Sequence, residues 1–89
     1  MRLDKFLQVS RLIKRRTVAK EVCAAGNVAI NGRPAKPGSV VTTGDVITIT
    51  WGRRVSSFQV LKVPEGNVPA SQARTLYKCL EEKLLPPEE

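Results

Sequence analysis

The chain has 89 residues, enough for one domain with a modest hydrophobic core. It carries 15 Lys and Arg against 8 Asp and Glu, a formal net charge of +7, and a domain this basic typically binds a polyanion. The hydrophobic content of 42% excludes wholesale disorder, and the aromatic content of 4% argues against a platform that stacks several single-stranded bases.

Several protein classes are excluded by what the sequence lacks. No apolar run approaches the roughly 18 residues of a membrane span, and Asp4 interrupts any signal-peptide core. Cys23 and Cys79 lack the spacing of metal ligands, and a disulfide-stapled secreted domain normally carries more cysteines. We therefore expect reduced thiols, a cytoplasmic protein, and no metal or cofactor.

The charge is unevenly distributed along the chain. Residues 1–62 hold 12 of the 15 basic side chains but only 3 of the 8 acidic ones, whereas residues 63–89 are net acidic. We assign the polyanion-binding surface to residues 1–62 and expect residues 63–89 to be a loop, a helix and an acidic tail packed on it.

The N-terminal part predicts two short helices. Leu3, Phe6 and Leu7 form the apolar stripe of the first helix. Thr17 is the expected N-cap of a second helix over TVAKEVCAAG, which should end at Gly26.

The middle of the chain predicts strands. Residues 28–30 form a short strand, and Asn31-Gly32 is a strong signal for a tight hairpin. The alternating VITIT at 46–50 and the segment VSSFQVLKV at 55–63 are two further strands.

The C-terminal part predicts a last helix, capped by Ser71, over Gln72–Leu84. Its apolar face would comprise Ala73, Leu76, Tyr77, Leu80 and Leu84. Pro86-Pro87 should stop it, with Glu88-Glu89 as a solvated tail. The predicted fold class is α+β: two N-terminal helices on a small curled antiparallel sheet, with an extra strand and a C-terminal helix.

The most informative feature is a cluster of positive charge before and within the second helix. It consists of Arg11, Lys14, Arg15, Arg16 and Lys20, which Arg2 and Lys5 can join from the first helix. A solvated helix face is the alternative interpretation, but these charges repel one another and only Glu21 lies nearby to offset them. The exposed N–H groups at a helix start also favour phosphate, so an anionic partner is the simpler explanation.

The order of motifs resembles a known RNA-binding family. RLDKFL, SRLIKRRTVA, G-x-V-x-I-N-G, P-G and G-D-x-I follow one another over residues 1 to about 50, as in the alpha-L RNA-binding domain (the S-four domain). The closeness of MRLDKFLQVSRLIKRRT, the length, and the appended segments narrow the resemblance to RqcP-like ribosome-associated quality-control factors, relatives of the fifteen-kilodalton heat-shock protein.

This resemblance implies a function, partners and site residues. Such proteins bind large-subunit ribosomal RNA and peptidyl-tRNA on obstructed large subunits, and support C-terminal alanine tailing by an RqcH-type NEMF-family protein. A cytoplasmic, ribosome-associated monomer without enzymatic activity or membrane contact is implied. The RNA-binding positions carried over are Arg2, Asp4, Lys5, Arg11, Lys14, Arg15, Arg16, Lys20, Asn31 and Gly32.

Two residues have competing interpretations. Asp4 either orients Arg2 or Arg16 from the helix start or accepts a hydrogen bond from RNA. Trp51 is expected to cover the core, with base stacking as the alternative, and the family gives no strong pattern for Trp51, Arg53 or Arg54.

Other functions remain as alternatives. An enzyme is disfavoured because His is absent, no catalytic motif appears, and residues 63–89 are too short for a catalytic domain. A DNA-binding or membrane-surface protein could use the same basic face, although this face lacks aromatic anchors. Among RNA-binding functions, a heat-shock-type recycling factor or an assembly factor that binds free large subunits would use the same basic surface.

Overall fold

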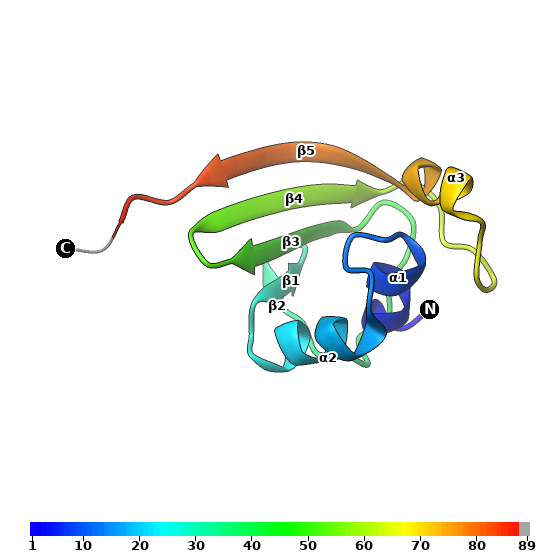
Figure 1. The fold of residues 1–89 in the computed structure, drawn as a ribbon, viewed down its shortest axis with the longest axis horizontal. Coiled ribbons are helices and arrows are strands. Elements are labelled where there is room, and N and C mark those ends of the chain that lie inside the picture. Colours follow the sequence, from blue (N-terminus) through cyan, green and yellow to red (C-terminus); the bar gives the residue numbers. More distant parts are fainter. Residues whose placement is uncertain (88–89) are drawn as a thin grey trace.

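The computed structural model describes residues 1–87 and has the predicted α+β class. Its elements are α1 (Leu3–Val9), α2 (Arg16–Ala24), β1 (Val28–Ile30), β2 (Arg33–Pro34), β3 (Val46–Trp51), β4 (Arg54–Val60), α3 (Ala70–Ala73), the 3-10 helix η1 (Arg74–Leu76) and β5 (Tyr77–Leu84). The strands form one antiparallel sheet in the order β2-β1-β3-β4-β5, and this sheet curves over α1 and α2 (Figure 1).

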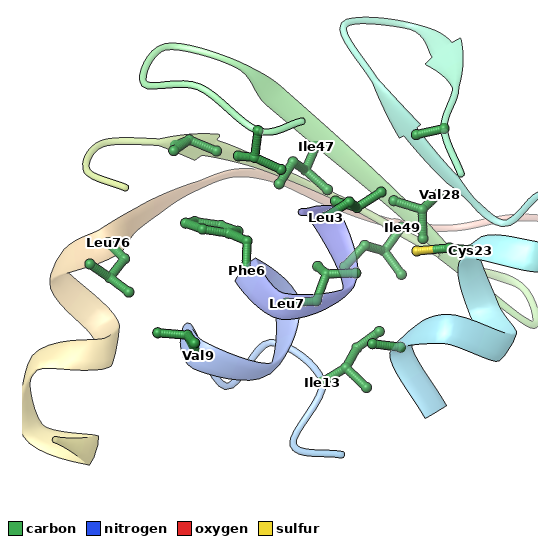
Figure 2. Close-up of a cluster of buried hydrophobic side chains, with 14 residues drawn as sticks. Leu3, Phe6, Leu7, Val9, Ile13, Cys23, Val28, Ile47, Ile49 and Leu76 are labelled. Atoms are coloured by element: carbon green, nitrogen blue, oxygen red, sulfur yellow. The ribbon is translucent and has the colours of Figure 1, made fainter. Parts of the chain in front are cut away.

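The core lies between the two N-terminal helices and the sheet. Phe6 and Leu7 of α1 are fully buried against a cluster that contains Ile47 of β3, and Cys23 of α2 is buried in the same cluster, as its apolar neighbours predict (Figure 2). The periodicity that predicted the first helix therefore reflects a continuous apolar contact with the sheet. This contact fixes α1 and α2 as a rigid base for the basic residues on their outer surfaces.

The start of α2 differs from the prediction. The helix begins at Arg16, and its N-cap is Arg15 in an extended conformation without a side-chain capping bond, so the assignment of Thr17 as the cap is wrong. The first N–H groups of α2 therefore lie beside basic side chains, where an external anion can accept their hydrogen bonds.

The hairpin predicted at Asn31-Gly32 is confirmed. Both residues have positive φ, 52° and 81°, as a type I′ turn requires. The Asn31 carboxamide joins this turn to the start of β3, because its oxygen accepts from the Val46 N–H at 2.9 Å and its nitrogen donates to Asp45 at 3.0 Å.

The predicted C-terminal helix is wrong beyond its first turns. Helical structure spans only Ala70–Ala73 and Arg74–Leu76, its N-cap is Pro69 instead of Ser71, and residues Tyr77–Leu84 form β5 on the edge of β4. A helix over 77–84 would leave β4 unpaired on the edge that faces away from β3. β5 pairs with this edge and packs the Tyr77 ring edge-on against Phe58.

The chain continues past β5 for only a few described residues. The strand ends at Leu84 before Pro86-Pro87, and the predicted tail Glu88-Glu89 lies outside the described residues. Within residues 1–87 the longest helix has 9 residues, so no helix there is long enough to cross a membrane.

Candidate nucleic-acid interface

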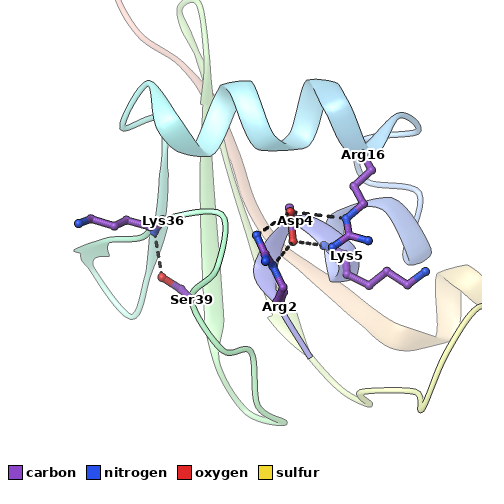
Figure 3. Close-up of polar contacts among 6 residues, drawn as sticks. All are labelled: Arg2, Asp4, Lys5, Arg16, Lys36 and Ser39. Atoms are coloured by element: carbon purple, nitrogen blue, oxygen red, sulfur yellow. Dashed lines mark hydrogen bonds and ion pairs between the residues drawn. The ribbon is translucent and has the colours of Figure 1, made fainter.

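A buried carboxylate at the start of α1 holds one arginine that precedes α1 and another that begins α2. The Asp4 side chain is 0% exposed and pairs with two guanidinium groups, Arg2 Nε at 3.2 Å and Arg16 Nε at 3.5 Å. Arg2 makes a forked contact, because its Nη2 also donates to Asp4 Oδ2 at 3.3 Å (Figure 3). The side chains of Arg2 and Arg16 nevertheless remain 52% and 45% exposed. The structure thus shows the orienting role that was one of the two interpretations of Asp4, and it orients both arginines.

The protonation state of Asp4 follows from its contacts. Burial by itself would raise the pKa of this carboxyl group. The Lys5 backbone N–H, which donates to Oδ1 at 2.8 Å, together with the hydrogen bond from Arg2 and the charge of Arg16, outweighs burial and lowers the pKa below its ordinary value of 3.8. Asp4 is therefore ionised at neutral pH, and the Arg2–Asp4–Arg16 group carries a net positive charge.

Backbone contacts fix this group in place. The segment 37–41 runs beside the first turn of α1, where the Leu3 N–H donates to the Ser39 carbonyl at 2.7 Å. The Val41 N–H donates to the Met1 carbonyl at 2.9 Å. The tight turn that contains Lys36 and Ser39 lies next to Arg2, whose guanidinium would lie 3.9 Å from a β-carbon added at Gly38 (Figure 3).

The loop after β4 forms the other side of this site, and sequence reasoning missed it. Lys5 Nζ donates to Asn67 Oδ1 at 2.7 Å across 62 residues of sequence. A hollow of about 480 Å³ lies between Arg2, Lys5 and Arg16 on one side and Pro64 and Glu65 on the other. We call Arg2, Asp4, Lys5 and Arg16 the Asp4 cluster.

The remaining predicted residues fall into separate places. Lys14 and Arg15 line a different hollow, between the start of α2 and the sheet, so the N-terminus of α2 borders both. Lys20 is exposed one turn after Arg16, and Arg11 is exposed at the bend after α1 with a φ of 62°. A positive φ at a non-glycine residue is uncommon, and the local sequence does not predict one at Arg11.

Asn31 and Gly32 lie apart from the Asp4 cluster, in the hairpin turn. The Asn31 amide is occupied by Val46 and Asp45, and these hydrogen bonds explain its place in the hairpin without any ligand. An RNA contact at this turn stays a prediction.

Trp51 does not cover the core as expected. It ends β3 with 55% of its surface exposed and lines the hollow that contains Lys14 and Arg15. Arg53, on the turn that follows, and Arg54, the first residue of β4, line the same hollow.

The arrangement of these basic side chains can bind anions. Exposed guanidinium and ammonium groups gather around the N-terminus of α2, where phosphate oxygens can accept charge-assisted hydrogen bonds. Within residues 1–87 no group of three or more metal-ligating side chains comes together.

Comparison with known proteins decides the family. The S4 domain model matches residues 1–47, more than half of the chain. This chain belongs to the S4-domain family. The S4 match covers α1, α2 and the first strands, and therefore includes the entire Asp4 cluster and the N-terminus of α2.

Close relatives of this S4-domain chain match most of its length. It is 49% identical to the RQC P-site tRNA stabilizing factor of Halalkalibacterium halodurans over 93% of each chain. It is 46% identical to the protein of the same name from Bacillus subtilis, over 96% of this chain and 98% of that one. The resemblance to RqcP-like factors is thereby confirmed.

A solved structure confirms the fold and the kinship with the heat-shock relative. A trimeric structure of Vibrio cholerae Heat Shock Protein 15 superposes with a TM-score of 0.81 at 32% identity, covering 90% of this chain and 81% of that one. The fold that this chain shares with the solved structure thus extends beyond the S4 match at residues 1–47.

Proposed function

We propose that this chain is a non-catalytic RNA-binding factor of ribosome-associated quality control that holds tRNA against large-subunit ribosomal RNA. The observation that carries the proposal is the Asp4 cluster, in which a buried carboxylate positions Arg2 and Arg16 while about half of each arginine side chain stays exposed. Relatives at 46% to 49% identity are named RQC P-site tRNA stabilizing factor, which supports tRNA as the ligand.

The mechanism is preorganised binding of phosphate. Free arginine side chains lose rotamer entropy when they bind, whereas Arg2 and Arg16 are already held by Asp4. Each phosphate that they contact releases condensed counterions, which gives affinity that falls steeply with salt. Because A-form RNA hides its base edges, recognition depends on the shape of a folded stem and on its 2′-hydroxyl groups.

In the cell, this grip would act on an obstructed large subunit that still holds peptidyl-tRNA. By clamping one arrangement of tRNA and ribosomal RNA, the protein biases a conformational population without a chemical step. We propose that this bias supports alanine tailing of the stalled chain by an RqcH-type NEMF-family protein, in the cytoplasm, with this chain acting as a monomer.

The likeness to Heat Shock Protein 15 favours a second candidate function, recycling of blocked large subunits without tailing. Affinity purification of the tagged chain separates the two. Co-purification of large subunits, peptidyl-tRNA and a NEMF-family protein supports tailing, whereas large subunits without that protein support recycling.

The same purification tests the proposal as a whole. The control variant Lys83→Ala, which changes an exposed lysine on β5, should recover large subunits like the wild type, and Arg16→Ala should recover far fewer. Recovery of small subunits alone would refute the proposed function. Competition at fixed salt then distinguishes tRNA from duplex DNA, and equal competition would show a general polyanion binder.

A further inference from the structure

A second hollow flanks the N-terminus of α2, on the side away from the Asp4 cluster. It has a volume of about 740 Å³, within the range of ~300–1,000 Å³ of small-molecule sites. The segment before α2 forms one wall, and the ends of β3, β4 and β5 form the other. We call this hollow the Trp51 groove.

The sheet provides its aromatic floor. Ile47, Ile49 and Trp51 alternate along β3 and share the face that the helices cover, but this cover ends before Trp51. Trp51 pairs with Arg54 and then Leu84 across the sheet.

The cross-strand row beside Trp51, Arg54 and Leu84 contains a small side chain that deepens the groove. It places the small side chain of Ser56 between those of Ile49 and Glu82. Because the serine side chain is short, the surface of the sheet is recessed directly beside the indole of Trp51.

Trp51 is open on more than one side. A smaller hollow of about 220 Å³ touches it from the direction of Val22 and Thr50. A tryptophan that closed the core would be enclosed by neighbours, whereas this one presents its ring to solvent in a chain with few aromatic residues.

The rim of the groove is strongly basic. Lys14 and Arg15 line one side, and Arg53 and Arg54 line the other. Glu82 is the acidic residue of the lining, and it faces Arg54 at 3.5 Å with both side chains more than half exposed. Within residues 1–87 no carboxylate lies within 4.0 Å of the charged nitrogens of Lys14, Arg15 or Arg53.

We propose that the Trp51 groove binds one unpaired nucleotide of the RNA that the Asp4 cluster holds, with the base on the Trp51 indole and its flanking phosphates against Lys14, Arg15 and Arg53. Charge complementarity argues for a polyanion, and an exposed indole on a low floor suits the face of a base. The three consecutive residues Lys14, Arg15 and Arg16 connect the two sites, so one RNA can reach both. This inference rests on the proposed function and extends it from paired to unpaired RNA.

The experiment uses two RNA duplexes that differ by a single-nucleotide bulge. Trp51 is the single tryptophan of the chain, so its fluorescence reports directly on the groove. The bulged duplex should quench this fluorescence and bind about tenfold more tightly than the fully paired one, given typical stacking contributions. The paired duplex should leave the fluorescence almost unchanged.

Three variants separate the groove from the Asp4 cluster. Trp51→Ala should reduce the affinity ratio between bulged and paired duplex to about one, and Trp51→Phe should retain most of it, because a smaller aromatic ring still stacks. Arg16→Ala should weaken both duplexes and preserve their ratio. Thermal unfolding of each variant verifies that it is folded, as expected for exposed side chains.

Two results would overturn the inference. If wild type binds both duplexes equally, or Trp51→Ala keeps the preference, no base occupies the groove. If poly-glutamate quenches Trp51 as strongly as the bulged duplex, the groove is a site for acidic peptide instead. In either case Arg16-dependent binding of the paired duplex would leave the proposed function intact, whereas a wild type that binds neither duplex would refute that function.

Discussion

At the scale of single residues, Asp4 explains how a carboxylate can serve a basic surface. By charge alone it opposes phosphate binding, yet it is fully buried and holds two guanidinium groups in fixed positions. A buried carboxylate with good partners is costly to disrupt, because removing its charge leaves two neighbouring cations uncompensated. Asp4 therefore belongs to the fold and to the site at once.

Replacing Asp4 tests this dual role. Asp4→Asn should lower the free energy of unfolding at neutral pH by about 2 kcal/mol, since charge-assisted hydrogen bonds are lost. Affinity for tRNA should also fall, because Arg2 and Arg16 lose their common anchor. Urea unfolding and tRNA titration measure the two effects. Normal stability together with normal binding would exclude both interpretations of Asp4.

The difference in unfolding free energy between wild type and Asp4→Asn should depend on pH, because the pKa of Asp4 is lowered in the folded protein. A depressed pKa in the folded state means that the carboxylate stabilises the fold above its ordinary value of 3.8 and that this stabilisation disappears as pH falls through the folded value. The stability gap between wild type and Asp4→Asn should therefore be largest near neutrality and close in acid. Asp45, whose pKa is also lowered, is present in both proteins and does not contribute to the gap.

The two cysteines should differ in reactivity. Burial, together with the charge of Asp4, raises the pKa of Cys23 to about 11, whereas Cys79 is exposed on β5. A thiol reagent at about pH 8, near the ordinary thiol pKa, should modify Cys79 in the native protein and leave Cys23 intact until the chain unfolds. Mass spectrometry after tryptic digestion locates the label, and rapid labelling of Cys23 in the native state would contradict the described core.

At the scale of elements, local signals account for the first half of the chain better than for the second. Apolar spacing and the Asn31-Gly32 pair predict α1, β1 and the hairpin, because these depend on residues close in sequence. The segment after Leu76 has the spacing and composition of a helix, but pairing with β4 overrides this local preference. Whether residues 77–84 form a helix or a strand therefore depends on the whole sheet and not on their local sequence.

Two leucines distinguish the observed strand from the predicted helix. The helix would place Leu76 and Leu80 one turn apart on one apolar face, but the structure leaves Leu76 2% exposed and Leu80 48% exposed. Leu76→Ala should therefore cost about 3 kcal/mol of unfolding free energy, and Leu80→Ala within about 0.5 kcal/mol. Chemical denaturation measures both, and equal losses would favour a helical face.

The candidate site also combines features that depend on neighbours in sequence with features that depend on tertiary contacts. The sequence predicts the basic run before α2, because its members are neighbours in the chain. It does not predict the contact between Lys5 and Asn67 or the hollow bordered by Glu65, because these form only when the loop after β4 folds back beside α1. The exposure of Trp51 was also missed, since it depends on where the helical cover of the sheet ends.

At the scale of the whole molecule, the basic surface continues on both sides of the N-terminus of α2. The Asp4 cluster lies on one side and the Trp51 groove on the other. The shared core packs α1 and α2 against the sheet and so holds these two sites in a fixed relation, which lets a folded RNA contact both without rearrangement of the protein. Such a surface suits a factor that stabilises one arrangement of its RNA partners.

The salt dependence of tRNA binding tests this account most directly. Dissociation constants measured over a range of salt concentrations give the number of phosphate contacts from the slope of the double-logarithmic plot. Arg16→Ala should weaken binding and reduce the slope by about one unit, while Lys83→Ala on β5 should change neither. Identical slopes and affinities for wild type, Arg16→Ala and Lys83→Ala would contradict the central claim that the cations held by Asp4 bind the RNA backbone.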